Sequence, residues 1–175
     1  MKSKQSAGIL LFRRSVDGYE VFLVHPGGPF WAKKDEGAWS VPKGEFSDDE
    51  VPLEAALREF SEEVGFRPAG PYRELPAVRQ SGGKTVHCWL AEGDCDPAAL
   101  VSNSFEMEWP PRSGRLQQFP EVDRGAWFSL DEARRRINKA QARFLESLES
   151  EDFGAEKVGP WDGDQPTVGF QEEDA

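Results

Sequence analysis

The chain has 175 residues, with 21 Lys and Arg against 32 Asp and Glu, and its formal net charge is −11. This length suits one domain with a full core, and 38% hydrophobic residues, including 12 Phe and 6 Trp, can fill that core. The negative charge argues against a nucleic-acid polymer or an anionic membrane as partner. An anionic substrate would therefore have to meet local cations or a metal.

The cysteines and the apolar runs exclude several other classes of protein. Cys88 and Cys95 form no CxxC pattern and no histidine cluster lies near them, so neither a zinc site nor a disulfide framework is predicted. Residues 1–6 are polar and the apolar run at 9–12 is too short for a signal peptide. No stretch approaches the ~18 apolar residues of a membrane span. We therefore expect a cytoplasmic protein with reduced thiols.

The first elements predict a β-hairpin. Residues 6–14 (SAGILLFRR) and 19–25 (YEVFLVH) have strand composition, and a turn at residues 15–18 separates them. The run from Ile9 to Phe12 is apolar without strict alternation, which is typical of a strand covered on both faces. This pattern favours a layered α/β architecture. We interpret His25, at the strand end, as structural.

Residues 26–37 form a loop rich in Gly and Pro that contains Trp31, Lys33 and Lys34. An aromatic ring can stack on a base and a lysine can bind a phosphate, so these three residues are candidates for substrate binding. The alternative is that the aromatic residues fix the loop to the core and the lysines face solvent. A short strand predicted at residues 39–44 then brings in Lys43, which could neutralise a phosphate oxygen.

Residues 44–66 (GEFSDDEVPLEAALREFSEEVGF) predict an amphipathic helix with readable ends. Pro52 suits the first turn of a helix, and Gly65 suits a left-handed cap at its end. The apolar positions recur at helical spacing and predict one buried stripe, formed by Leu53, Ala56, Leu57, Phe60 and Val64.

The same helix carries Glu59, Glu62 and Glu63 at positions i, i+3 and i+4, so their carboxylates share one flank. Like charges at this spacing repel each other. Clustered carboxylate oxygens suit hard divalent cations such as Mg²⁺ or Mn²⁺. The alternative is an acidic helix face that is simply solvated.

The spacing across this segment is more specific than the three glutamates alone. Gly44 is followed after five residues by Glu50 and after seven more by Arg58 and Glu59, and the segment ends with the second glutamate pair, Val64, Gly65 and Phe66. This pattern resembles the Nudix box at every fixed position. The resemblance implies an α/β fold, the Nudix-type α/β/α sandwich with a mixed β-sheet. It also implies metal-dependent hydrolysis of a nucleoside diphosphate-linked substrate.

The resemblance also implies roles for individual residues. Glu59, Glu62 and Glu63 would be metal ligands together with the Gly44 carbonyl, and one of the three glutamates could act as the base. Glu50 and Arg58 would form a supporting ion pair. The lead-in WSVPKG at residues 39–44 resembles the branch that acts on dinucleoside polyphosphates and diphosphoinositol polyphosphates. The tyrosine usual beyond the box in diadenosine tetraphosphate hydrolases has no counterpart at residues 79–84, RQSGGK.

Three more strands are predicted after the helix. Residues 71–80 and 84–92 flank a Ser-Gly-Gly turn and predict a hairpin, and residues 103–109 alternate apolar and polar side chains. The loop at residues 110–118 holds Arg112 and Arg115. Two arginines could clamp phosphates through bidentate contacts, although an ordinary surface turn is the alternative.

The last part of the region before residue 150 contains one more candidate metal ligand or base and a predicted helix. The resemblance implies a glutamate ahead of the last strand that completes the metal or base set; Glu121 is the candidate, with Glu106 and Glu108 as rivals. Ser129 and Glu132 fit a capping box. They predict a helix from residue 130 to 137 that continues to residue 148, with Arg134, Arg135 and Arg136 as its solvated face.

We divide the chain into a Nudix hydrolase domain at residues 1–150 and an acidic, Gly- and Pro-containing C-terminal tail at residues 151–175. Phe153, Trp161 and Phe170 are candidate anchors of that tail. The predicted activity is that of a Nudix pyrophosphohydrolase acting on a nucleoside triphosphate or a dinucleoside polyphosphate with Mg²⁺ or Mn²⁺. The alternative is a Nudix-fold nucleotide sensor or interaction module without turnover.

Overall fold

The computed structural model describes residues 4–16 and 18–149. The predicted tail at residues 151–175 and its three anchors lie outside these ranges. Within the described residues there is a six-stranded sheet. Five of its strands have the order β4-β5-β1-β2-β8, and the sixth, β3, pairs with the N-terminal part of β1, whereas β2 pairs with its C-terminal part. Its strands are β1 (Gln5–Ser15), β2 (Gly18–Pro26), β3 (Lys43–Glu45), β4 (Arg73–Arg79), β5 (Thr85–Glu92) and β8 (Val122–Ser129).

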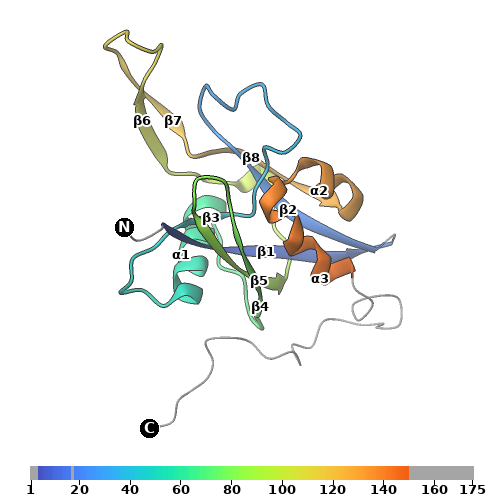
Figure 1. Ribbon diagram of the computed structural model, residues 1–175. Coiled ribbons are helices and arrows are strands. Elements are labelled where there is room, and N and C mark those ends of the chain that lie inside the picture. The colour runs from blue at the N-terminus through green and yellow to red at the C-terminus, as the bar shows by residue number, and fades with distance from the viewer. Residues whose placement is uncertain (1–3, 17, 150–175) are drawn as a thin grey trace.

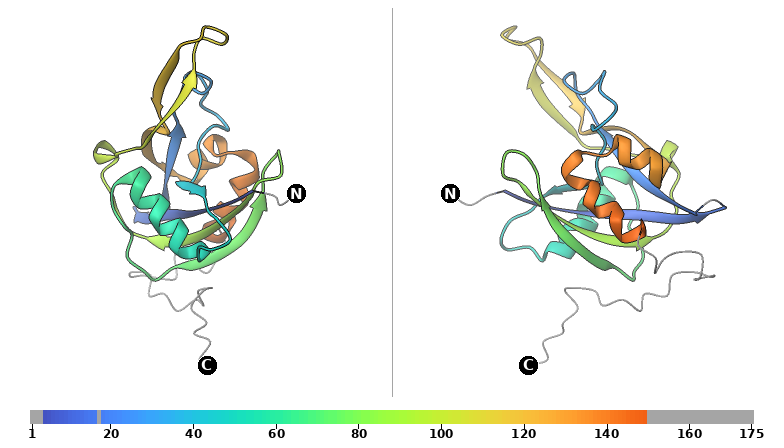
Figure 2. Two further views of the ribbon diagram at one scale, coloured as in Figure 1. Left: turned by 90° about the vertical axis from the view of Figure 1, so that its left-hand side faces the viewer. Right: turned by 45° about the vertical axis from the view of Figure 1, so that its right-hand side comes forward.

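The sheet is mixed and lies between two helical layers. β1 runs parallel to β5, whereas its pairings with β2 and β3 are antiparallel. Helix α1 (Pro52–Val64) covers one face (Figure 1). The other face is covered by α2 (Leu130–Arg136), the 3₁₀ segment η2 (Lys139–Leu145) and α3 (Glu146–Glu149) (Figure 2). The predicted α/β/α sandwich is confirmed.

The central strand β1 contributes side chains to the hydrophobic cores on both faces of the sheet, as its unbroken apolar run predicted. Leu10 and Phe12 join the core under α2 and α3, whereas Ile9 and Leu11 join the core under α1. All four side chains are fully buried. The predicted apolar stripe of α1 lies in the same core as Ile9, and Gly65 ends the helix with a φ of 96°. The sequence pattern of α1 therefore translates directly into its position on the sheet.

A second, two-stranded sheet stands apart from the main one. β6 (Ser104–Glu108) and β7 (Leu116–Pro120) form an antiparallel hairpin that projects beyond the sandwich (Figures 1 and 2). The short 3₁₀ segment η1 (Pro97–Ala99) precedes it. The sequence predicted β6 but assigned residues 110–118 to a loop. In the structure that loop is shorter, because β7 already begins at Leu116.

One sequence-based prediction on the C-terminal side is wrong. The helix after residue 130 is not continuous, since Ile137 has extended backbone angles and forms a bridge to Trp39. The backbone N–H of Asn138 donates to the carbonyl of Trp39 at 2.7 Å, which draws the chain away from the helix axis. A long-range contact therefore overrides the helical pattern.

The arginine triplet lies on the solvent-facing side of α2, with Arg134 and Arg135 exposed and Arg136 half-buried, and all three form ion pairs. Arg134 pairs with Asp131 and Glu149, Arg135 pairs with Glu132, and Arg136 pairs with Asp35 and Glu132. The ion pair between Arg136 and Asp35 links α2 to the loop at residues 27–37.

The strand predicted at residues 39–44 forms only in part. Trp39 and Ser40 make isolated bridges, and β3 begins at Lys43.

Candidate active site

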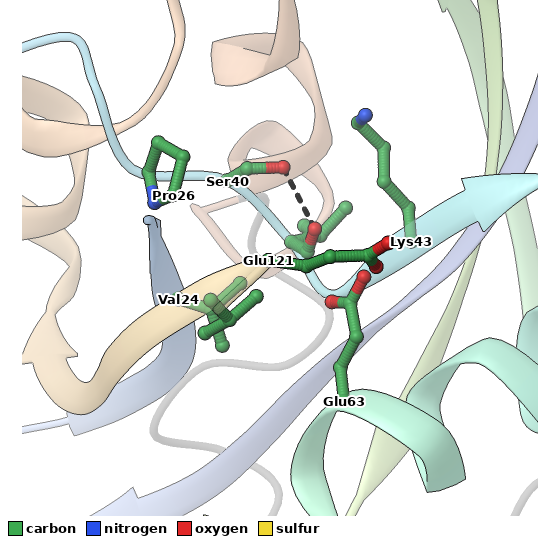
Figure 3. A pocket seen from close by; sticks show the side chains of 8 residues that line it. Val24, Pro26, Ser40, Lys43, Glu63 and Glu121 are labelled. Carbon is green, nitrogen blue, oxygen red and sulfur yellow. Dashed lines mark hydrogen bonds between the residues drawn. The ribbon is translucent and has the colours of Figure 1, made fainter. Parts of the chain in front are cut away.

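A cavity of about 120 Å³ lies where β2 ends, β3 begins and β8 starts, beside the last turn of α1. Figure 3 shows the carboxylate of Glu63, from α1, pointing toward the carboxylate of Glu121, which precedes β8. The strand ends bring these two side chains together from distant parts of the sequence. The side chains around the cavity are those of Val24, Pro26, Ser40, Val41, Lys43, Glu63, Glu121 and Val122.

Glu63 is the buried acid of the site. It is only 7% exposed, and burial raises its pKa to about 8, with further raising by the nearby charges of Glu59 and Glu121. Lys43 opposes this shift through its charge and through its backbone N–H, which donates to the Glu63 carboxylate. Near neutral pH and without a cation, Glu63 therefore holds a proton.

Lys43 is the basic residue of the cavity. Burial lowers its pKa, and the charge of Lys84 lowers it further, whereas Glu63, Glu45 and Glu59 raise it. In Figure 3 its side chain extends away from the carboxylates of Glu63 and Glu121. The ammonium group is thus available at the cavity edge for an anionic ligand.

Arg58 organises the acids on the outer side of α1. Its Nε and Nη2 donate to the two carboxylate oxygens of Glu50, both at 3.0 Å. Its Nη1 donates to Glu59 at 2.8 Å and to Glu62 at 3.4 Å. The hydrogen bonds to Glu50 and Glu59, with the charges of these two carboxylates, raise the pKa of Arg58. The ion pair between Glu50 and Arg58 that the sequence resemblance implied is present.

Glu59 connects this ion-pair network to the cavity. Burial raises its pKa and Arg58 lowers it, while the charges of Glu62 and Glu121 act in the same direction as burial. Gly44 faces this side chain so closely that a Cβ atom at residue 44 would lie 2.0 Å from the carboxyl carbon of Glu59. Only glycine leaves room for the Glu59 carboxylate against β3.

The carboxylates of Glu59, Glu63 and Glu121 suit a hard divalent cation, although their oxygen atoms are not arranged around a single point. The charges of Glu59 and Glu121 raise the pKa of Glu63, and the charge of Glu121 raises that of Glu59; a divalent cation bound by carboxylate oxygens would relieve that repulsion. In the part of the chain that the structure describes, no three acidic, His or Cys side chains form a ready metal site. Glu62, whose side chain is 41% exposed, bonds to Arg58 and does not line the cavity.

The backbone on both sides of Glu121 fixes its place. Its carbonyl accepts from the N–H of Gly27 at 3.0 Å, and its own N–H donates to the carbonyl of Asn103 at 2.8 Å. The rival candidates Glu106 and Glu108 lie on the projecting β6, where Glu108 accepts from the N–H of Gly114 at 2.7 Å. Of the three, Glu121 is therefore the one at the cavity.

The predicted substrate-binding residues outside the box do not line this cavity. Trp31, Lys33 and Lys34 are exposed on the loop at residues 27–37, with the Lys34 ammonium 5.1 Å from the Trp31 ring. Arg112 and Arg115 are exposed at the tip of the β6–β7 hairpin. Lys43 is the exception, since it does line the cavity.

A contact that the sequence did not reveal joins that loop to the hairpin. The rings of Phe30 and Trp109 meet at a centroid distance of 5.4 Å, and a Cβ atom at Gly28 would lie 3.0 Å from the Phe105 ring. The two aromatic residues were visible in the sequence, but neither spacing nor composition pairs them. Together the loop and the hairpin form one exposed edge beside the cavity.

Known proteins resemble this chain in sequence and in fold. The NUDIX domain family model matches residues 2–148. The chain is 32% identical over 140 residues to the asymmetrical bis(5'-nucleosyl)-tetraphosphatase of Rattus norvegicus, covering 74% of this chain and 81% of the rat protein. It is 29% identical over 138 residues to a nucleoside triphosphate pyrophosphatase/Nudix hydrolase fusion protein of Bifidobacterium longum, covering 65% of this chain but only 28% of that protein.

Solved structures share the fold at low sequence identity. The Ap4A hydrolase of C. elegans, in a binary complex, matches with a TM-score of 0.56 and 20% identity over 82% of this chain and 95% of that one. The NUDIX domain of Shewanella oneidensis NrtR, complexed with ADP ribose, matches with a TM-score of 0.57 and 18% identity over 85% and 88%. None of the helices in the described residues has the length and apolarity to cross a membrane. The chain belongs to the Nudix family.

Proposed function

We propose that this protein hydrolyses a phosphoanhydride bond in a nucleoside diphosphate-linked substrate, either a nucleoside triphosphate or a dinucleoside polyphosphate, in a metal-dependent reaction. The observation that carries this proposal is the pair of facing carboxylates, Glu63 and Glu121, in one cavity with Lys43. Mutual repulsion and burial keep Glu63 protonated without a cation. A bound divalent cation would relieve the repulsion between these carboxylates, and an anionic ligand would pair with the cation and with Lys43.

Mg²⁺ or Mn²⁺ would be held by Glu59, Glu62 and Glu63 and by the carbonyl of Gly44. A bound divalent cation neutralises phosphate oxygens and lowers the pKa of a water molecule. Oxygen-only ligands favour these hard cations over zinc. Glu62 would have to turn from Arg58, and its bond to Arg58 is the longest of the guanidinium contacts at 3.4 Å.

The protein's own side chains would supply the base and the positioning. Glu121 is exposed at the cavity and faces Glu63, so it is our preferred acceptor of the proton from the attacking water. Lys43 would bind a phosphate oxygen. Arg58 and Glu50 would hold the orientation of Glu59, and their bidentate geometry makes that support rigid.

The remaining predicted residues would contact the part of the substrate beyond the cleaved bond. Trp31, Lys33 and Lys34 would do so from the loop, and Arg112 and Arg115 from the hairpin. The contact between Phe30 and Trp109 supports this assignment, because it joins both segments into one edge. A dinucleoside polyphosphate would extend onto that edge, and the tetraphosphatase name of the rat relative favours this substrate class.

The test is release of phosphate or pyrophosphate from diadenosine polyphosphates and nucleoside triphosphates, with Mg²⁺ and with a chelator. We expect release only with the metal, and at least ~10-fold less from Glu121→Gln, because a positioned base contributes about 10²–10⁴-fold. Nucleotide binding without any turnover would instead favour the non-catalytic sensor.

A further inference from the structure

The reaction proposed above leaves His25 without a role, although it occupies a central position. It is fully buried at the end of β2, between Val24 and Pro26, which both line the cavity. Its Nδ1 lies 3.0 Å from Oδ1 of Asp123, just beyond Glu121 and Val122 in the chain. Its Nε2 lies 2.6 Å from the carbonyl oxygen of Lys34. One ring thus bridges three segments around the cavity.

Both partners of the ring are hydrogen-bond acceptors. A neutral imidazole has one N–H donor and one bare nitrogen that only accepts. A carboxylate and a backbone carbonyl offer no proton, so a neutral ring would set a bare nitrogen against an oxygen inside the protein. An unmade bond of that kind is costly in a buried site. The imidazolium form donates to both oxygens, and the charge of Asp123 balances it.

The charged groups around the ring are consistent with this form. Asp123 also forms an ion pair with Arg124 at 3.6 Å. The Trp39 ring packs edge-on against His25 at a centroid distance of 5.2 Å. The Nε1–H of Trp39 donates to Asp35, which is paired with Arg136. The ammonium of Lys34 lies 5.1 Å from the centre of the Trp31 ring, whereas the carbonyl of Lys34 contacts the imidazole of His25.

We propose that His25 is a positioning residue, a buried imidazolium that fastens the loop at residues 27–37 and the turn carrying Glu121 to the end of β2. Its bond to Lys34 holds the loop, and its ion pair with Asp123 holds the turn. The placement of Glu121 relative to Glu63 then depends on the charge of a ring that never touches the substrate. The consequence for catalysis rests on the proposed function, whereas the charge and the bridging do not.

The first experiment measures the protonation state of each ring nitrogen of His25 by nitrogen NMR at pH 7.5. The chain has only two histidines, and His87 is the internal reference, because burial lowers its pKa and its Nε2 meets Gln5. We expect both ring nitrogens of His25 to carry protons and only one of His87 to do so. A bare ring nitrogen on His25 at this pH would overturn the proposal.

A matched pair of variants tests the role of Asp123. Asp123→Asn removes the balancing charge while keeping the shape, so the imidazolium signals of His25 should disappear. Asp94→Asn is the control, since Asp94 pairs with Arg13 on the exposed surface and should leave the signals of His25 unchanged. Retention of the imidazolium signals in Asp123→Asn would contradict the ion pair.

Limited digestion with trypsin tests, in the absence of substrate, whether His25 holds the loop in place. Trypsin cleaves the peptide bond after Lys34, and the carbonyl of that bond is the one that contacts His25. A hydrogen bond from a charged donor should slow this cleavage, so we expect His25→Gln and Asp123→Asn to be cut there about 10-fold faster or more. Cleavage after Arg112, at the exposed hairpin tip, is the reference in the same digest. Equal rates after Lys34 in all three proteins would refute the fastening.

Activity measurements separate the two proposals. If His25 positions Glu121, Asp123→Asn should lower kcat by about 10-fold or more with a smaller change in KM. An unchanged kcat would refute the catalytic consequence. A wild-type protein that hydrolyses none of the substrates would overturn the proposed function, and the NMR and digestion results would still decide the state of His25. The wild-type spectrum decides it even if His25→Gln does not fold.

Discussion

Replacing Glu63 by Gln should make the metal-free protein more stable at alkaline pH. The folded pKa of Glu63 is raised from 4.5 to about 8, and each unit corresponds to ~1.4 kcal/mol, so the ionised form opposes folding by about 5 kcal/mol at the upper bound. Because the folded protein holds this proton more tightly than the unfolded chain, the favourable contribution is complete below about 4.5 and is lost as the pH rises to about 8.

The assay is thermal or urea unfolding of both proteins in chelator at several pH values. Between pH 6 and pH 8 the wild type should lose about 2 kcal/mol relative to Glu63→Gln, which corresponds to a fall in Tm of about 4–8 °C. Glu54→Gln, on the exposed face of α1 with a side chain 64% exposed, is the control and should follow the wild type. Parallel pH profiles for the wild type and Glu63→Gln would refute the reasoning.

Three further substitutions test the rest of the site. Glu62→Gln should lower the metal-dependent rate by more than ~10-fold, and a rate within that factor would remove Glu62 from the metal set. Gly44→Ala should lower metal affinity by about 10-fold or more, measured by calorimetric titration, because its Cβ would meet the Glu59 carboxylate at 2.0 Å. Arg58→Lys keeps the charge but loses the bidentate bond to Glu50, so kcat should fall by about 10-fold; a wild-type kcat would show that charge alone suffices.

Local patterns in the sequence were sufficient for α1 and for most of the sheet. The apolar spacing from Leu53 to Val64 predicts the buried face of α1, and Gly65 predicts its end. Cys88 and Trp89 are neighbours in β5 and lie in different cores, as expected because successive side chains of a strand point to opposite faces. In these elements the neighbours along the chain decide the structure.

Contacts between distant segments decide what the sequence could not predict. The helix after residue 130 breaks because Ile137 pairs with Trp39, and no pattern near residue 137 indicates this. Strand β7 is mostly exposed and polar, so it lacks the apolar alternation that identified β6. The same limit applies to the candidate site, where the pKa of Glu63 is raised by burial and by Glu59, and also by Glu121, which is far away in sequence.

The measurement that most directly tests the proposed hydrolysis is identification of the products released from a panel of phosphorylated substrates. The panel contains nucleoside triphosphates, diadenosine polyphosphates, ADP-ribose and a diphosphoinositol polyphosphate, each with Mg²⁺ and with a chelator. We predict metal-dependent release of phosphate, pyrophosphate or a nucleotide from the nucleoside triphosphates or the diadenosine polyphosphates, and its loss in Glu121→Gln. Absence of release from every substrate, with nucleotide binding still detectable, would contradict the proposed reaction.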